Sequence, residues 1–204
     1  MNLIDPIDHP RIQAFIKHVK TECKKAKIKV ELRNVRYLML GQGMKCSGYF
    51  DEANRKLVVA MNNPVSVQVL VHEFGHFTQW QEKTKIWKDA EWAMYHIEEW
   101  LGGKKKRDIK KWISLSRDLE LDNEKRTVQL IKDFKLPINT KKYTRSANAY
   151  VLFYNWMLVS RRWCKPGNTP YSNKKVLRAC SPKFNMRYDA LSANMRKAFE
   201  EANI

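Results

Sequence analysis

The feature that most constrains the fold is a stretch after Pro64 that is apolar on nearly every side when placed on a helix. Its large apolar side chains are Val67, Leu70, Val71, Phe74 and Phe77. The one polar strip along it consists of Gln68, His72, His76 and Gln79. A helix that is apolar almost all round belongs in a core, where polar groups need partners. The sequence therefore predicts a buried helix that is capped by Asn62-Asn63-Pro64 and runs to about Gln81.

The polar strip contains the pattern H-E-x-x-H, from His72 to His76. Two imidazoles four residues apart lie on one helix face, one turn apart, which is the spacing at which both can ligate a single tetrahedral Zn²⁺. Glu73 lies about 100° round from His72, so it can reach a metal-bound water without being a ligand. Zinc makes such a water acidic enough for a carboxylate to deprotonate, and Glu73 is the expected general base. The alternative is a pair of buried histidines satisfied by hydrogen bonds alone.

A catalytic zinc needs a third protein ligand, and Glu120 is the best candidate. It lies near the middle of the apolar stripe of a helix expected at 106–135. The stripe consists of Ile109, Ile113, Val128, Ile131 and Phe134. A carboxylate in such a stripe requires a cationic partner, and a divalent ion is sufficient. An internal ion pair between Glu120 and a nearby Lys or Arg is the alternative.

Three other residues bear on this expected zinc site. Glu124 lies on the face of Glu120 one turn on, where it would orient a metal-binding histidine through its other ring nitrogen. His96, 20 residues after His76, is the rival third ligand. Glu82 would serve in a variant that has a glycine turn, but Gln79 stands where that turn needs Gly. No other cofactor is predicted.

Strand patterns come first along the chain and helical patterns follow, which predicts an α+β fold rather than an alternating one. A helix capped by Asp8 is expected to end near Lys25. The expected strands are 28–40, which ends at Gly41-Gln-Gly43, and a hairpin of 46–50 with 56–61, so the sheet is small and about three-stranded. Further helices are expected at 86–101, 106–135, 146–163 and 187–202. We expect a single domain over 1–204: residues 1–102 supply the sheet and active-site helix, and 103–204 form a basic helical half that supplies the third ligand.

The chain is strongly basic, with 39 Lys and Arg against 21 Asp and Glu and a net charge of +18. Most of the excess lies in residues 103–204, which hold 24 basic and 9 acidic residues. A positive half attracts polyanions, so nucleic acid or an acidic protein is an expected partner. The seven tryptophans lie between Trp80 and Trp163, where they could stack bases, although core packing explains most of them more simply. A solvated face that aids solubility is the alternative for the charge.

We find neither a membrane-spanning segment nor a secretory signal in the sequence. No apolar run approaches the roughly 20 residues that span a bilayer. The first eight residues lack the basic start and apolar stretch of a secretory signal, and the four cysteines show no C-x-x-C spacing. We therefore expect a cytoplasmic protein with no membrane partner and with reduced thiols.

Two segments resemble a known family. Val-His-Glu-Phe-Gly-His, ending at His76, is followed after a helical insertion by Ser-Arg-Asp-Leu-Glu-Leu-Asp-Asn-Glu, residues 116–124, and together they resemble the gluzincin metallopeptidases. The resemblance is to minimal zincins of the ImmA/IrrE and SprT-like kinds and to metallopeptidases encoded by tailed bacteriophages, and similar segments span about 46–130. It implies a zincin-like fold and a zinc metalloendopeptidase with His72, His76 and Glu120 as ligands and Glu73 as base. A phage-encoded enzyme of this kind would act in the host cytoplasm.

The resemblance has further implications and two departures. In zincins the strand before the active-site helix commonly offers its edge to substrate, which implies a docking edge on Lys56 to Met61 or on its partner strand. A donor for the developing oxyanion is also expected, and the candidates are Tyr150, Tyr154, Arg161 and Arg162. The position of Glu124 usually holds a small acid or amide in such families. The third His and Cys-rich module of SprT-like proteins are not visible here.

A second interpretation belongs to another functional class. In it the chain is a basic, nucleic-acid-associated protein whose zinc site is structural or vestigial. Binding that weakens steeply with salt would favour this interpretation.

Overall fold

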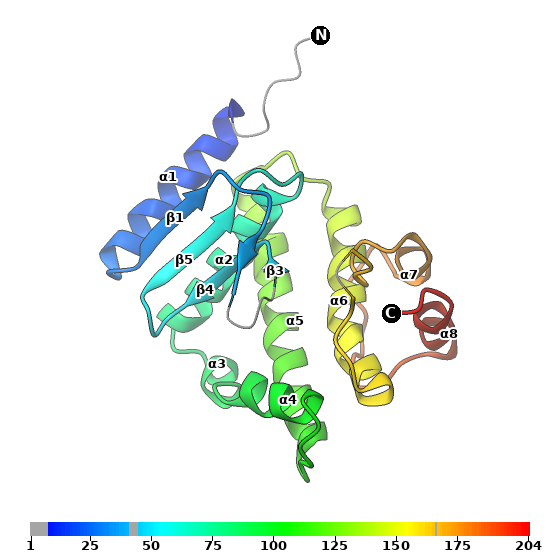
Figure 1. The fold of residues 1–204 in the computed structure, drawn as a ribbon. Helices are drawn as coiled ribbons and strands as arrows, with labels where there is room; N and C mark the ends of the chain where they lie inside the picture. The colour runs from blue at the N-terminus through cyan, green and yellow to red at the C-terminus, as the bar shows by residue number, and fades with distance from the viewer. Residues whose placement is uncertain (1–7, 41–44, 166) are drawn as a thin grey trace. The chain divides into compact units, whose positions relative to one another are not determined.

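The computed structural model describes residues 8–40, 45–165 and 167–204. The predicted strand break at Gly41-Gln-Gly43, and all but the last of the eight amino-terminal residues considered for a signal, lie outside the described residues. The strands are β1 (Lys29–Arg33), β2 (Leu38–Met39), β3 (Lys45–Cys46), β4 (Gly48–Asp51) and β5 (Lys56–Ala60). The helices are α1 (Pro10–Lys25), α2 (Ser66–Gln81), α3 (Lys85–Asp89), α4 (Ala93–Leu101), α5 (Ile109–Asp133), α6 (Thr140–Ser160), α7 (Lys174–Ala179) and α8 (Ala193–Glu201) (Figure 1). The predicted α+β class is confirmed.

The chain divides into two compact units. The first unit consists of Met1–Thr84 and Lys125–Ile138, and the second of Lys85–Glu124 and Asn139–Ile204. Helix α5 belongs to both, because its first part lies in the second unit and its last turns lie in the first. The sheet is therefore in the first unit, and α6, α7 and α8 are in the second.

The three-stranded sheet of the first unit has the order β1-β5-β4. β1 runs parallel to β5, with Lys29 opposite Lys56, and β4 runs antiparallel to β5, with Phe50 opposite Leu57. The central strand β5 carries the most apolar sequence of the sheet, and its residues from Leu57 to Ala60 are fully buried. The predicted hairpin is confirmed, but the predicted strand 28–40 is split, because β2 pairs with β3 in a separate two-stranded sheet.

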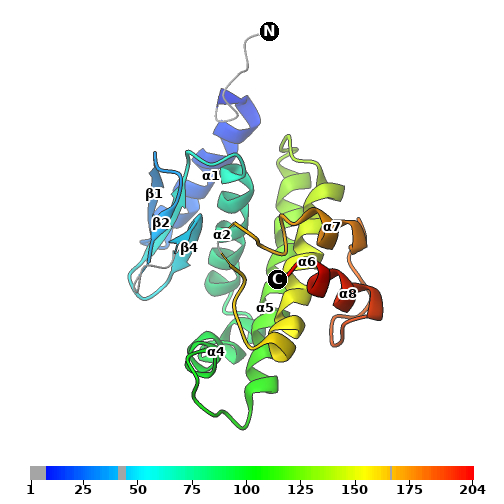
Figure 2. The ribbon, with the colours of Figure 1, turned by 45° about the vertical axis from the view of Figure 1, so that its right-hand side comes forward.

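Helices α1 and α2 both pack on this sheet, α1 along β1 and α2 along β4 and β5 (Figure 2). Phe15 of α1 lies edge-on to Phe74 of α2, with ring centroids 5.8 Å apart. Both helix starts differ from the prediction. His9, rather than Asp8, caps α1, since its Nδ1 accepts from the amide of Arg11. The side chain of Asn63 accepts from the amide of Val65, so it closes the turn before α2 and does not cap the helix itself.

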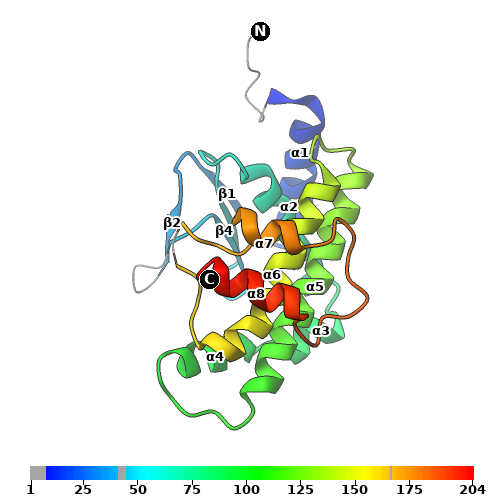
Figure 3. The same ribbon diagram turned by 90° about the vertical axis from the view of Figure 1, so that its right-hand side faces the viewer.

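The second unit is helical and packs around α6 (Figure 3). Buried residues of α6 belong to one apolar cluster with Ile97 of α4, Ile113 of α5 and Phe199 of α8. α6 begins at Thr140, earlier than predicted, because Asn139 caps it by accepting from the amide of Lys142. The predicted helix 86–101 is broken into α3 and α4, α8 is shorter than expected, and the six-residue α7 was not predicted.

Candidate metal centre

Helix α2 places the H-E-x-x-H pattern as its sequence requires. Its five large apolar side chains are all buried, with Leu70, Val71 and Phe77 completely so. His72 and His76 lie on the remaining face and are half-buried. Their ring centroids are 4.9 Å apart and the rings are nearly perpendicular, at 88°. Two imidazoles are thus held side by side at the edge of a core.

Glu120 completes a group of three possible ligands. It lies on α5, in the part of that helix that belongs to the second unit. The part that belongs to the first unit begins five residues later, at Lys125. One ligand atom from each of His72, His76 and Glu120 can be chosen so that all three lie within 4.8 Å of one another. Among the described residues this is the only such group of three or more His, Cys, Asp or Glu side chains.

This donor set suits a metal ion. Two imidazoles and one carboxylate form one of the standard sets of a catalytic zinc, which keeps its fourth position open. The possible ligand atoms of the group lie within 4.8 Å of one another, and the bonds of zinc to nitrogen and oxygen are about 2.0–2.2 Å long. The residues present therefore fit a divalent ion.

The rival ligands are engaged elsewhere. The ring of His96 stacks on Trp112 at 4.3 Å, and its Nδ1 lies 3.3 Å from the Nζ of Lys106. The carboxylate of Glu82 pairs with Arg126 at 2.7 Å. Among the described residues, the possible metal group contains Glu120 and contains neither His96 nor Glu82.

Gln79 has a role that the sequence analysis did not assign. Its side chain is completely buried, and its Oε1 lies 2.9 Å from the Nδ1 of His76. An amide oxygen can only accept, so Nδ1 donates and Nε2 is the nitrogen that His76 offers to a metal. The signal was present, because Gln79 lies in the same polar strip, three residues after His76.

Glu73 lies beside the start of β4. It is 8% exposed, and a Cβ added to Gly48 would lie 3.1 Å from its Cγ. Burial raises the pKa of the Cys46 thiol, and the negative charge of Glu73 raises it further. Glu73, which follows His72 directly in the sequence, thus lies beside the segment from Cys46 to Gly48.

Two tyrosines on α6 lie close to Glu120 in the second unit. The hydroxyls of Tyr150 and Tyr154 are 3.3 Å apart. Burial raises the pKa of both hydroxyls well above the ordinary value, and the charge of Glu120 is the next largest cause. Both tyrosines are therefore protonated hydrogen-bond donors at neutral pH.

The other oxyanion candidates and the predicted orienting residue behave differently. Arg161 donates to the carbonyl of Trp100, and Arg162 to that of Ile204, so both guanidinium groups hold backbone in place. Glu124 is buried. Burial is the main cause that raises the pKa of the nearby Tyr188 to about 12, and the charge of Glu124 is a smaller cause. Its contact with a metal-binding histidine stays a prediction.

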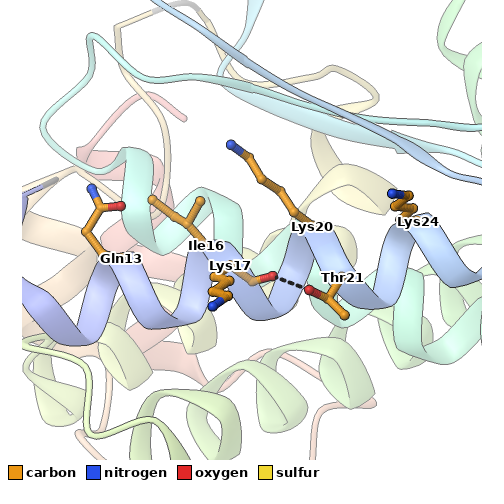
Figure 4. A pocket seen from close by; sticks show the side chains of 6 residues that line it. All are labelled: Gln13, Ile16, Lys17, Lys20, Thr21 and Lys24. Atoms are coloured by element: carbon orange, nitrogen blue, oxygen red, sulfur yellow. Dashed lines mark hydrogen bonds between the residues drawn. The ribbon is translucent and has the colours of Figure 1, made fainter.

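A second surface feature lies on α1. A pocket of about 340 Å³ follows one face of this helix (Figure 4). It is lined by Gln13, Ile16, Lys17, Lys20, Thr21 and Lys24. None of these residues belongs to the metal group.

The helices and the comparisons with known proteins give no further pointer to function. None of the helices in the described part of the chain combines the length and apolarity needed to cross a bilayer. Searches against protein-family models, curated proteins and solved structures found no match to this chain. What can be said of its function therefore comes from the group formed by His72, His76 and Glu120, which could hold a metal ion.

Proposed function

We propose that this protein is a zinc-dependent metallopeptidase that hydrolyses peptide bonds in proteins or peptides. The observation that carries the proposal is the meeting of Glu120 with His72 and His76. These side chains come from segments more than forty residues apart. The resemblance to gluzincins, including those of tailed bacteriophages, agrees with this ligand set. Four free cysteines suit action in a cytoplasm.

The chain's own residues have distinct roles in this proposal. A bound zinc supplies a Lewis acid and lowers the pKa of a water molecule. Glu73 would take a proton from the attacking water and return it to the leaving amine, and Gln79 would keep the Nε2 of His76 directed to the ligand group. Tyr150 or Tyr154 donates a hydrogen bond to the oxyanion that develops on the substrate carbonyl.

The edge strand β4 is the proposed docking site for the substrate backbone. β5 cannot serve, because it is bonded on both sides, to β1 and to β4. In the three-stranded sheet β4 pairs with β5 alone, and Gly48 at its start adjoins Glu73. A peptide added at this edge would gain main-chain hydrogen bonds close to the general base.

The first experiment replaces the general base. Glu73→Gln keeps the shape of the side chain but cannot accept a proton, so zinc content should stay at one ion per chain while hydrolysis falls by about 10² to 10⁴-fold. Zinc is measured by atomic emission and hydrolysis with a casein or quenched-peptide substrate. Glu98→Gln, an exposed position on α4, is the matched control and should keep full activity. Undiminished hydrolysis in Glu73→Gln would rule out the mechanism.

The second experiment tests the ligands themselves. His72→Ala and Glu120→Ala should each lose stoichiometric zinc, because two remaining ligands hold the ion too weakly. His96→Ala should retain it, since His96 stacks on Trp112 instead. Full zinc content in Glu120→Ala would show that another group completes the site.

A further inference from the structure

A long segment of the chain contains no acidic residue. Between Asp133 and Asp189 there are 55 residues, and they include twelve Lys and Arg but not one Asp or Glu. The segment covers α6, α7 and the chain between them. No carboxylate within the segment itself compensates this positive charge.

The basic side chains of this segment are mostly exposed. The exposed ones are Lys135, Lys141, Lys142, Arg161, Arg162, Lys165, Lys174, Lys175, Arg178, Lys183 and Arg187. Arg187 pairs with Asp189, which lies just beyond the segment. No carboxylate of the described residues pairs with Lys174, Arg178 or Lys183. Lys174 and Arg178 lie one turn apart on one face of α7, about 6 Å along the helix axis.

Exposed aromatic rings accompany these charges. Tyr171 is 45% exposed and lies three residues before Lys174. Its ring rests edge-on against Tyr150 at 5.7 Å, which holds it in a fixed place. Trp163, 38% exposed, is held in the same way against Phe153 at 5.5 Å. Anchored rings with an open side are suited to stacking on bases.

We infer that the described residues of segment 161–187 bind single-stranded nucleic acid, with Lys174, Arg178 and Lys183 on the phosphates and Tyr171 and Trp163 on the bases. A phosphate backbone complements a chain segment that has twelve cations and no acid, and binding releases its counterions. Protein interfaces, in contrast, are depleted in lysine. This inference goes beyond the proposed peptidase and does not depend on the metal centre.

The pocket face of α1 supplies a matched comparison. Lys17, Lys20 and Lys24 are also exposed and lie along one helix (Figure 4). That face has no exposed aromatic ring, and the apolar residue beside the lysines, Ile16, is 7% exposed. The two basic surfaces therefore carry similar charge, but only segment 161–187 offers rings for stacking.

The test compares two triple variants of the full-length protein. One carries Lys174→Gln, Arg178→Gln and Lys183→Gln, and the other carries Lys17→Gln, Lys20→Gln and Lys24→Gln. Both remove three charges from exposed positions, and circular dichroism checks their folding. Affinity for a fluorescent 20-nucleotide oligo-dT is measured by anisotropy at 50 and 200 mM salt. We expect at least a tenfold loss in the first variant, less than a threefold loss in the second, and weaker wild-type binding at the higher salt.

Two further measurements separate the inference from its rivals. Tyr171→Ala keeps every charge and should weaken binding about tenfold, because it removes one stacking platform. His72→Ala should bind the oligonucleotide as the wild type does, although its hydrolysis is lost, so the two proposals can fail separately. Equal losses of affinity in both triple variants would show that binding depends on net charge alone, and would overturn the inference. Stronger binding of polyglutamate or of phosphatidylserine vesicles would assign the surface to an acidic protein or a membrane, and would overturn the inference.

Discussion

Gln79 orients His76, one of the three side chains of the possible metal group. A lone imidazole on a helix can rotate about its side-chain bonds, and either nitrogen can face the metal. The hydrogen bond from Nδ1 of His76 to the buried amide oxygen of Gln79 removes that choice. Hydrogen-bond partners of this kind are often worth 10 to 100-fold in metal affinity.

We therefore expect Gln79→Ala to weaken zinc binding by about tenfold or more while the fold is kept. Competition with a fluorescent zinc chelator measures the affinity. Gln81→Ala, an exposed position at the end of α2, is the control and should bind zinc normally. A Gln79→Ala protein with wild-type affinity would show that His76 is oriented by something else.

At the scale of elements, the approach of β4 to α2 depends on Gly48. A Cβ at this position would lie 2.5 Å from Cγ1 of Val69, 3.1 Å from Cγ of Glu73 and 3.2 Å from the backbone oxygen of Val58. The valine methyl can rotate away, but the oxygen belongs to the central strand β5 and cannot. Only glycine lets the strand pass this close to the helix that carries the proposed general base.

We expect Gly48→Ala to lower the free energy of unfolding by about 1–3 kcal/mol through overpacking. Urea unfolding followed by tryptophan fluorescence measures it. Gly102→Ala, whose added Cβ would be 3.3 Å from its nearest neighbour, should cost clearly less. Equal costs at the two glycines would mean that β4 moves away from α2 without strain.

At the scale of the whole molecule, a metal that binds only the folded chain must stabilise it by mass action. At a free zinc concentration of 100 times the dissociation constant, the gain is about 2.7 kcal/mol. For a chain of this size we expect the melting temperature to rise by about 5 °C or more. Thermal unfolding with zinc and with a chelator measures the shift. Glu120→Ala should show almost none, and an equal shift in that variant would place the stabilising zinc elsewhere.

How much could be predicted differs between helices and strands. The long helices α1, α2 and α5 were anticipated because their apolar period is a local property of the chain. The split of the expected strand 28–40 was not, since alternation cannot say which partner a strand will find. The parallel pairing of β1 with β5, across three intervening strands, is set by long-range packing. α7 escaped prediction because its six residues are too short to show a period.

The sequence by itself determined the imidazole pair, since His72 and His76 are four residues apart and any helix there must put them on one face. It also determined that Glu120 lies in an apolar stripe, where a carboxylate needs a partner. Only the tertiary structure decided that Glu120 joins the histidines in a possible metal group, that Gln79 holds His76, and that His96 stacks on Trp112. The physical reason is the distance along the chain over which each feature is determined. Helical spacing is a property of neighbouring residues, whereas the meeting of two helices depends on how the whole core packs.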